Sequence, residues 1–213
     1  SRLDLLKRNA DVFREVVPNV TASASDAVLV VATNPLDIMT YMAARFASES
    51  GVSSSRVLGS GTMLDTARFR SLLGTHVDVD PQHVHAYVIG EHGDSEVLTW
   101  SLATVGSMHL EEFCLQKGIR LDDETRQGID GDVRNAAYVI IDGKGATYYG
   151  IGAALAKLAD VVLHDQRSVL TVSAAGDGTS GISDVSISLP RVVGGGGVLS
   201  TLYLPLDRYE QRA

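Results

Sequence analysis

Residues 27–32 form an unbroken apolar run, and this run restricts the possible folds more than any other stretch of the chain. Its composition, Ala-Val-Leu-Val-Val-Ala, is typical of a strand covered on both faces, as in a parallel sheet. Asn34 and Pro35 follow, and apolar residues then recur at helical spacing over about 36–47. Asn34 is suited to cap a helix, and Pro35 suits the first helical position. This order predicts that Asn34 lies at the carboxyl edge of a parallel sheet, where open α/β folds bind ligands.

The remaining periodicities predict an α/β fold in which parallel strands come first and antiparallel strands come later, with the change near Gly59. The chain opens with an amphipathic helix over residues 3–20. Further strands are expected at 56–59, 83–89, 96–102, 168–173 and 185–193, and further helices at 64–76, 109–116, 122–142 and 147–164. The glycines at 194–197 indicate a turn, and the polar stretch 203–213 predicts no regular element.

Composition excludes several classes of function. The net charge is −8 without a Lys/Arg block, which argues against a nucleic-acid surface or an anionic membrane patch. Cys114 is the only cysteine, so neither an internal disulfide nor a cysteine metal cluster is expected. His83 and His85 alternate along one strand without an acidic or cysteine partner at ligand spacing, so no metal site is expected. We find no signal peptide and no bilayer-spanning run, and we expect a cytoplasmic protein without a membrane partner.

The glycine-rich stretch 90–95, Gly-Glu-His-Gly-Asp-Ser, follows the predicted strand 83–89. Its glycines allow a sharp turn and a close approach to a ligand, and His92 in this position is suited to proton transfer near neutral pH. The alternative is a histidine in a polar hairpin turn. Asp65 and Arg68 lie three residues apart on one helix face. One interpretation is that they form a surface ion pair without a functional role. On the functional interpretation, the carboxylate orients a histidine and the guanidinium binds a substrate carboxylate.

Together these stretches resemble the L-lactate dehydrogenases of the lactate/malate dehydrogenase family, and the resemblance covers nearly the whole chain. It is carried by Ser-Arg-Leu at 1–3, Thr-Asn-Pro at 33–35, Leu-Asp-Thr-Ala-Arg-Phe-Arg at 64–70, Gly-Glu-His-Gly-Asp at 90–94 and Ala-Thr-Tyr-Tyr at 146–149. The resemblance implies that residues 1–59 are the second half of an NAD-binding domain, the C-terminal part of a Rossmann-type parallel sheet. It implies that residues 60–213 are an α+β substrate domain with antiparallel strands.

The same resemblance implies an NAD-dependent enzyme of glycolysis and fermentation that interconverts pyruvate and L-lactate, acting as a cytoplasmic homotetramer. It implies that His92 is the proton donor and acceptor, that Asp65 orients it, and that Arg68 binds the substrate carboxylate. It also implies that Arg2 polarises the substrate carbonyl from a mobile loop. The remaining implied site residues are Asn34 and Thr147 for substrate, Ala32, Thr33, Asn34, Ser60 and Ile151 for NAD, and Arg70 and His85 for an allosteric fructose 1,6-bisphosphate.

The chain departs from the family pattern at its start. It has no Gly-x-Gly-x-x-Gly turn after a strand and no acidic residue about twenty positions later. We therefore expect a piece of a longer product, whose isolated activity is doubtful. Two alternatives stay open: a malate dehydrogenase and a truncated, non-catalytic subunit. The residues Glu91 and Trp100 around His92 look more like those of lactate enzymes, and the neutral Thr147 offers no cation for a second carboxylate.

Overall fold

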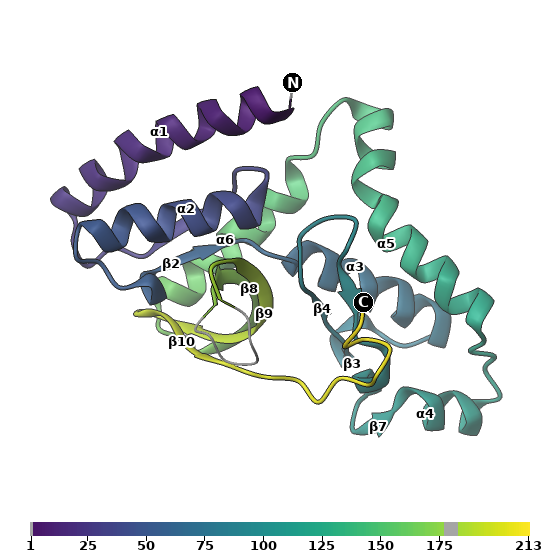
Figure 1. The fold of residues 1–213 in the computed structure, drawn as a ribbon. Coiled ribbons are helices and arrows are strands. Elements are labelled where there is room, and N and C mark those ends of the chain that lie inside the picture. Colours follow the sequence, from purple (N-terminus) through teal and green to yellow (C-terminus); the bar gives the residue numbers. More distant parts are fainter. Residues whose placement is uncertain (1, 177–182) are drawn as a thin grey trace.

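The computed structural model describes residues 2–176 and 183–213, and side chains from Leu6 onward. The chain forms two lobes, which lie side by side in Figure 1. One lobe is built on a five-stranded sheet in the order β1-β2-β8-β9-β10, and the other on helices with short strands. The sheet consists of β1 (Leu29–Val31), β2 (Val57–Gly59), β8 (Ser168–Ala175), β9 (Ser186–Gly194) and β10 (Gly197–Thr201).

This sheet joins strands from the two ends of the chain. β1 and β2 pair in parallel from Leu29↔Val57 to Val31↔Gly59. β2 also pairs antiparallel with β8 through Gly59↔Ser173, and β8 and β9 form a long antiparallel ladder. The parallel and antiparallel strands that the sequence predicted are therefore parts of one sheet. β10, which was not predicted, completes it, because the glycine turn before it returns the chain along β9.

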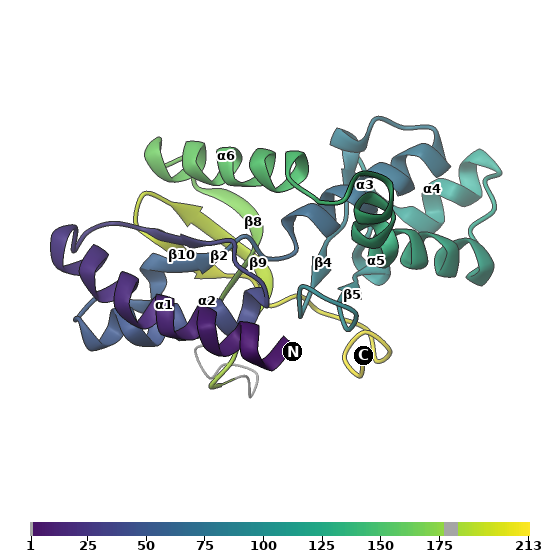
Figure 2. The same cartoon turned by 90° about the horizontal axis from the view of Figure 1, so that it is seen from above.

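Helices cover both faces of the sheet, as Figure 2 shows. α1 (Arg2–Ser23) and α2 (Leu36–Glu49) lie on one side, and α6 (Tyr149–Leu163) lies on the other. Neighbouring residues of β2 serve the two cores: Val57 packs with α2, and Leu58 packs with Leu158 and Val161 of α6. Fully burying such a side chain stabilises the fold by about 1.5–3 kcal/mol. Among the described residues, no helix is both long and apolar enough to cross a membrane.

The second lobe packs α3 (Met63–Val77) against α5 (Asp123–Lys144), with α4 (Leu110–Lys117) beside them. Phe69 is fully buried in its core and meets the Trp100 ring edge-on at 4.8 Å. The short strands of this lobe are β3 (Val84–His85), β4 (Val88–Ile89), β5 (Val97–Leu98), β6 (Thr104–Val105) and β7 (Met108–His109).

Two strand predictions in this lobe were wrong in extent. The predicted strand 83–89 is broken into β3 and β4, which belong to different sheets. At the break the backbone N–H of Tyr87 donates to the Thr99 hydroxyl at 3.2 Å. A side-chain oxygen thus takes the place of the backbone carbonyl that would accept this bond in a continuous strand pair. The predicted strand 96–102 is β5 followed by a 3₁₀ turn, Trp100–Leu102. The predicted helices are all present, within a few residues of their expected ends.

Gly61 turns the chain from β2 into α3. Its φ of 56° is left-handed, and a Cβ placed on it would lie 2.3 Å from the carbonyl oxygen of Thr171 in β8. Only glycine fits both restrictions, because any side chain would clash with the backbone of the neighbouring strand. The first residues of α3 are thereby held against the sheet.

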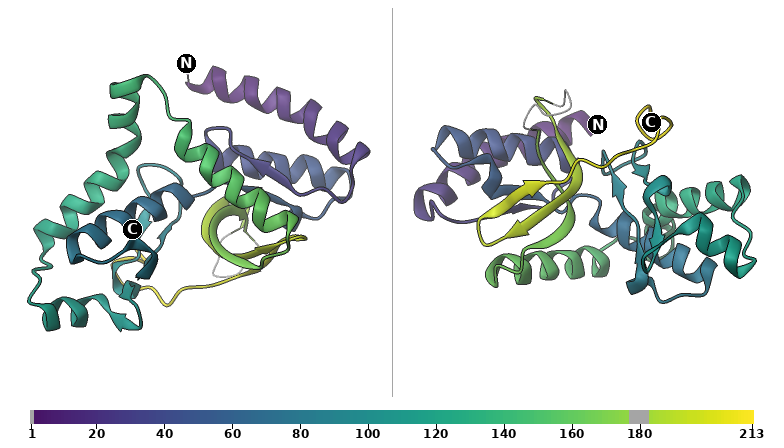
Figure 3. Two further views of the ribbon diagram at one scale, coloured as in Figure 1. Left: turned by 180° about the vertical axis from the view of Figure 1, so that it is seen from behind. Right: turned by 90° about the horizontal axis from the view of Figure 1, so that it is seen from below.

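After β10 the chain crosses from the sheet to the second lobe, as Figures 1 and 3 show. Residues 203–213 contain no helix or strand, as predicted, and 208–212 form turns. Glu210 fixes this segment, because its carboxylate accepts hydrogen bonds from the Ser101 backbone N–H at 2.8 Å and from the Ser101 hydroxyl at 2.6 Å.

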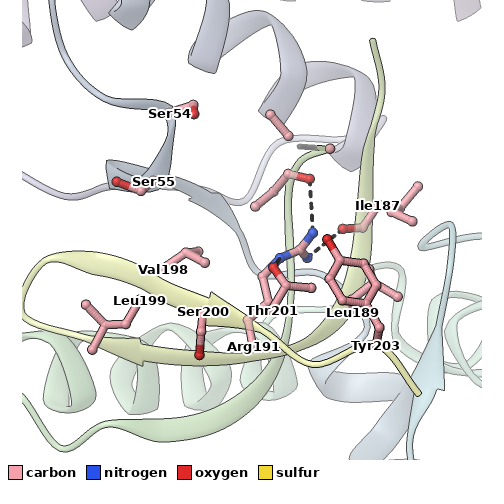
Figure 4. Close-up of a pocket in the computed structure, with 13 residues that line it drawn as sticks. Ser54, Ser55, Ile187, Leu189, Arg191, Val198, Leu199, Ser200, Thr201 and Tyr203 are labelled. Atoms are coloured by element: carbon pink, nitrogen blue, oxygen red, sulfur yellow. Dashed lines mark hydrogen bonds between the residues drawn. The ribbon is translucent and has the colours of Figure 1, made fainter. Parts of the chain in front are cut away.

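Arg191 in β9 lines a cavity of about 220 Å³ beside β10, drawn in Figure 4. Arg191 is 2% exposed, and its guanidinium donates to the carbonyl oxygens of Val172 at 2.6 Å and Ile187 at 2.8 Å. It also donates to Ala174 and Thr201. These bonds use most of its donors within the sheet, so the arginine links β8, β9 and β10.

Candidate active site

A cavity of about 400 Å³ opens where the start of α2, the start of α3, the 90–95 loop and α5 meet. Four of the predicted site residues line it, although they are far apart in the sequence: Asn34, Asp65, Arg68 and His92. The fold brings them together because α3 begins where β2 ends, and because Gly90 forms a β-bridge with Ser188 of the sheet. The 90–95 loop is thus fixed beside the carboxyl ends of β1 and β2.

His92 and Asp65 form the closest charged contact in this cavity. Nδ1 of His92 lies 2.7 Å from Oδ2 of Asp65, which is 3% exposed. This hydrogen bond raises the pKa of His92 above its ordinary value, although burial opposes the shift. Nε2 of His92 makes no hydrogen bond to any residue that the structure describes. The ring is therefore oriented through one nitrogen and has the other available for proton transfer.

Arg68 lies one turn after Asp65 on α3. Its Nη1 donates to Oδ1 of Asp65 at 2.9 Å, so the intrahelical ion pair considered from the sequence is present. Asp65 uses its second oxygen for His92, and one carboxylate therefore holds both groups. Nε and Nη2 of Arg68 have no partner among the described residues, and they leave an edge of the guanidinium to bind a carboxylate.

Asp37 is a site residue that the sequence analysis missed. Its Oδ2 accepts the backbone N–H of His92 at 2.8 Å, and its Oδ1 accepts the Ser173 hydroxyl at 2.5 Å. Burial raises the pKa of Asp37 above its usual range. The Asp37 carboxyl therefore links α2 and β8 to the 90–95 loop. A signal was present: an acidic residue in the first turn of a helix that begins at the ligand-binding edge of the sheet.

The prediction that Asn34 caps the following helix was wrong. α2 begins at Leu36, Pro35 occupies the N-cap position, and no side chain caps the helix. The Asn34–Pro35 peptide bond is cis. The side chain of Asn34 is consequently not used in a cap, and the exposed residue lies on the wall of the cavity.

The residues predicted to contact NAD gather, with one exception, at one sheet edge. Residues 32–34 follow β1, and Ser60 follows β2. Because β1 and β2 are parallel, these segments lie side by side, and the Ser60 N–H donates to the Val31 carbonyl at 2.9 Å. Ile151 lies apart from them, in the first turn of α6.

One predicted substrate contact, Thr147, is not brought to the cavity, and a second, Arg2, lies outside the described side chains. Thr147 is exposed between α5 and α6 and does not line it. Here α5 continues to Lys144, whose ammonium lies over the rings of Tyr148 and Tyr149 at 4.5 and 4.7 Å. Arg2 begins α1, but its side chain lies outside the described part of the structure.

The predicted effector residues lie on another face of the second lobe. Arg70 lines a cavity of about 280 Å³, donates from Nε to the Ala86 carbonyl at 2.8 Å, and stacks over Tyr87 at 5.0 Å. His85 is exposed in β3, one residue before the carbonyl that Arg70 binds.

Two further charged residues on the wall of the cavity of about 400 Å³ were not predicted. Glu96 is 3% exposed, and burial raises its pKa to about 7. Arg134 of α5 donates to the Asp94 carbonyl at 2.7 Å. Within residues 2–176 and 183–213, no three His, Cys, Asp or Glu side chains are grouped so that they could hold a metal.

Comparison with known proteins identifies the family. Residues 1–59 match the lactate/malate dehydrogenase NAD-binding domain, and residues 62–213 match the lactate/malate dehydrogenase α/β C-terminal domain. Over its whole length the chain is 55% identical to the L-lactate dehydrogenase of Geotalea daltonii and 54% identical to that of Thermus aquaticus, and it spans 68% of each. It also matches the crystal structure of a minor L-lactate dehydrogenase from Enterococcus mundtii, with a TM-score of 0.91, 43% identity and 66% of that chain covered.

The chain therefore belongs to the lactate/malate dehydrogenase family, as its motifs predicted. It is an NAD-dependent oxidoreductase by family, and its relatives at 52–55% identity are named L-lactate dehydrogenases. The predicted combination of a Rossmann-type sheet and a substrate domain is also confirmed by the lactate dehydrogenase structures that it matches. The chain spans about two-thirds of the length of these relatives.

Proposed function

We propose that the full-length protein interconverts pyruvate and L-lactate, with His92 as the acid and base. The observation that carries this proposal is the shared carboxylate of Asp65, which holds His92 at 2.7 Å and Arg68 at 2.9 Å on one cavity wall. A 2-keto acid needs a cation for its carboxylate and a proton donor for its carbonyl. Arg68 and the free Nε2 of His92 provide these two groups side by side.

In the direction of reduction, Arg68 binds the pyruvate carboxylate and places the carbonyl oxygen near Nε2 of His92. Protonated His92 donates the proton on its Nε2 to the carbonyl oxygen of pyruvate, while the carbonyl carbon gains a hydride. The product is L-lactate. Asp65 stabilises the imidazolium before the transfer and holds the ring tautomer after it. In the oxidation of lactate, neutral His92 takes the hydroxyl proton back. Arg2 is proposed to polarise the carbonyl oxygen during closure, and Asn34 to contact the substrate.

The edge formed by β1 and β2 fits NAD, which supplies or takes the hydride when it is bound. Residues 32–34 and Ser60 present backbone and small side chains at the carboxyl ends of parallel strands, the usual ligand site of open α/β sheets. Ala32 and Asn34 are exposed there, so a ligand reaches them without displacing the core. Ile151 is proposed to add an apolar contact, and Thr147 a pocket contact for the substrate.

Substrate choice separates this proposal from the malate dehydrogenase alternative. Oxaloacetate carries a second carboxylate, which must be paired with a cation when the site closes. Arg134, which the sequence analysis did not consider, is such a cation on the cavity wall, but it already donates to the backbone carbonyl of Asp94 and faces the carboxyl of Glu96. We therefore expect pyruvate to be preferred. The test is the ratio of kcat/KM for pyruvate and oxaloacetate in the full-length enzyme at one pH. A ratio that favours oxaloacetate overturns the proposal, and no turnover of either acid supports the non-catalytic alternative.

We also propose an effector site for fructose 1,6-bisphosphate at Arg70 and His85, in a cytoplasmic homotetramer that serves glycolysis and fermentation. What supports the site is that the Arg70 guanidinium is held by the Ala86 carbonyl next to His85, so a cation and an imidazole share one surface. Arginine suits phosphate because its planar donors match two oxygens.

A further inference from the structure

Glu96 is the buried acid that the mechanism above does not use. It follows the catalytic loop directly, since its backbone N–H donates to the Gly93 carbonyl at 3.1 Å. Its side chain is 3% exposed, and its Oε1 has no hydrogen-bond partner in the described part of the chain. A buried carboxylate oxygen without a donor is costly, whereas a protonated carboxyl tolerates such a site.

The surroundings of Glu96 explain how its charge is balanced. From α3 it faces the negative Asp65 and the positive Arg68, from α5 it faces Arg134, and from its own loop it faces His92. It also lines a second cavity of about 450 Å³. The charged residues on the wall of that cavity are the acidic Asp123, Asp130, Asp207 and Glu210 and the cations Arg126 and Arg134. Desolvation by burial and the charge of Asp65 raise the pKa of Glu96 to about 7. Arg134, His92 and Arg68 lower this pKa, but their effect is smaller. The carboxyl is therefore neutral in mildly acidic solution and negative in mildly alkaline solution.

Resting on the proposed function, we propose that Glu96 is a positioning residue that sets the charge of the catalytic cavity, so that its neutral form favours the binding of a 2-keto acid. When Glu96 ionises, a second negative charge joins Asp65 beside Arg68 and His92. That charge opposes the incoming substrate carboxylate, and it favours the protonated form of His92. The site thus binds keto acids most tightly at acidic pH, where His92 also carries the proton that reduction consumes.

The first test measures the charge of Glu96 without requiring activity. Infrared difference spectra of the wild-type protein are recorded from about pH 5.5 to pH 8.5 and compared with those of Glu96→Gln. A protonated-carboxyl band that is present at low pH, lost near pH 7 and missing in the variant is the expected result. If no such band distinguishes the two proteins, the proposal is overturned. Glu96→Asp retains the carboxyl and should restore the titration.

The second test measures substrate binding in the full-length enzyme. KM for pyruvate should be similar in wild type and Glu96→Gln at about pH 5.5 and on the order of fivefold lower in the variant at about pH 8.5, the effect of one nearby charge. Glu124→Gln, which removes an exposed charge from α5, should match the wild type at both values. If Glu96→Gln is active and its KM changes with pH as in the wild type, the proposed role of Glu96 is overturned and the proposed function is unaffected. A wild-type enzyme that is inactive with pyruvate overturns the proposed function, and with it the role of Glu96 in keto-acid binding.

Discussion

The wall of the catalytic cavity and the sheet edge proposed for NAD differ in how they are held. On the wall, buried Asp65 holds His92 and Arg68, and Asp37 holds the loop that carries His92. At the edge, residues 32–34 and Ser60 follow the carboxyl ends of β1 and β2, and Ala32 and Asn34 are exposed. The comparison shows that the groups proposed for proton transfer and for carboxylate binding are held by contacts within these 213 residues. The four residues proposed to contact NAD at the edge, Ala32, Thr33, Asn34 and Ser60, carry no charge.

The largest effect is expected where one carboxylate organises the whole wall. Asp65→Asn in the full-length enzyme should lower kcat/KM for pyruvate roughly a thousandfold, because the imidazolium loses its buried counter-charge. The pKa of His92 should also fall, and pyruvate reduction should then decline at a lower pH than in the wild type, since it needs the protonated ring. Steady-state rates from about pH 5 to pH 9 measure both effects. Asp142→Asn, an exposed change on α5, is the control, and an unchanged pH profile for Asp65→Asn would contradict the assignment.

A smaller loss is expected at Arg68. Arg68→Lys keeps the charge but removes the planar donors, so kcat/KM for pyruvate should fall about a hundredfold, mainly through KM. Arg120→Lys is the matched control, because Arg120 pairs with Asp122 at the surface and is 82% exposed. Initial rates at several pyruvate concentrations separate KM from kcat. A loss confined to kcat would show that Arg68 does not bind the ground-state carboxylate.

Substitutions of Asp37 test whether the 90–95 loop needs the hydrogen bonds that this carboxylate accepts from outside the loop. Asp37→Ala leaves the His92 N–H and the Ser173 hydroxyl without their acceptor, and kcat should fall about tenfold. Asp37→Asn retains an acceptor oxygen and should recover most of the activity. Equal losses in both variants would indicate that the charge of Asp37, rather than its hydrogen bonds, matters.

The smallest effect concerns the effector surface, which lies outside both regions of the comparison. In an enzyme activated by fructose 1,6-bisphosphate, Arg70→Gln should weaken the activation severalfold and leave the rate without effector nearly unchanged. Arg45→Gln removes an exposed charge from α2 and serves as the control. An enzyme with the same pyruvate KM with and without the bisphosphate would refute the effector site.

Motifs within one local segment were the most predictable features. The helical spacing on α3 placed Asp65 and Arg68 on one face, and the glycine-rich turn marked His92. Glu96 and Asp37 were missed because their roles come from burial and from partners over 25 residues away, which local periodicity does not contain. Asn34 was assigned as a cap because its residue type suits one, but Pro35 holds that position. The lactate/malate dehydrogenase resemblance supplied the roles that spacing alone left open.

The antiparallel pairing of β2 with β8 also has a consequence for folding kinetics. Gly59 and Ser173 are register partners although α3, α4, α5 and α6 lie between them in the sequence. The second lobe is therefore an insertion within the sheet, and most of its contacts are made inside the loop that this pairing closes. Contacts between distant residues form slowly, because loop closure costs entropy before the contacts stabilise the chain. The helical lobe and the local pairing of β8 with β9 can accordingly gain structure first, and the pairing of β2 with β8, together with the bridge between Gly90 and Ser188, completes the fold last.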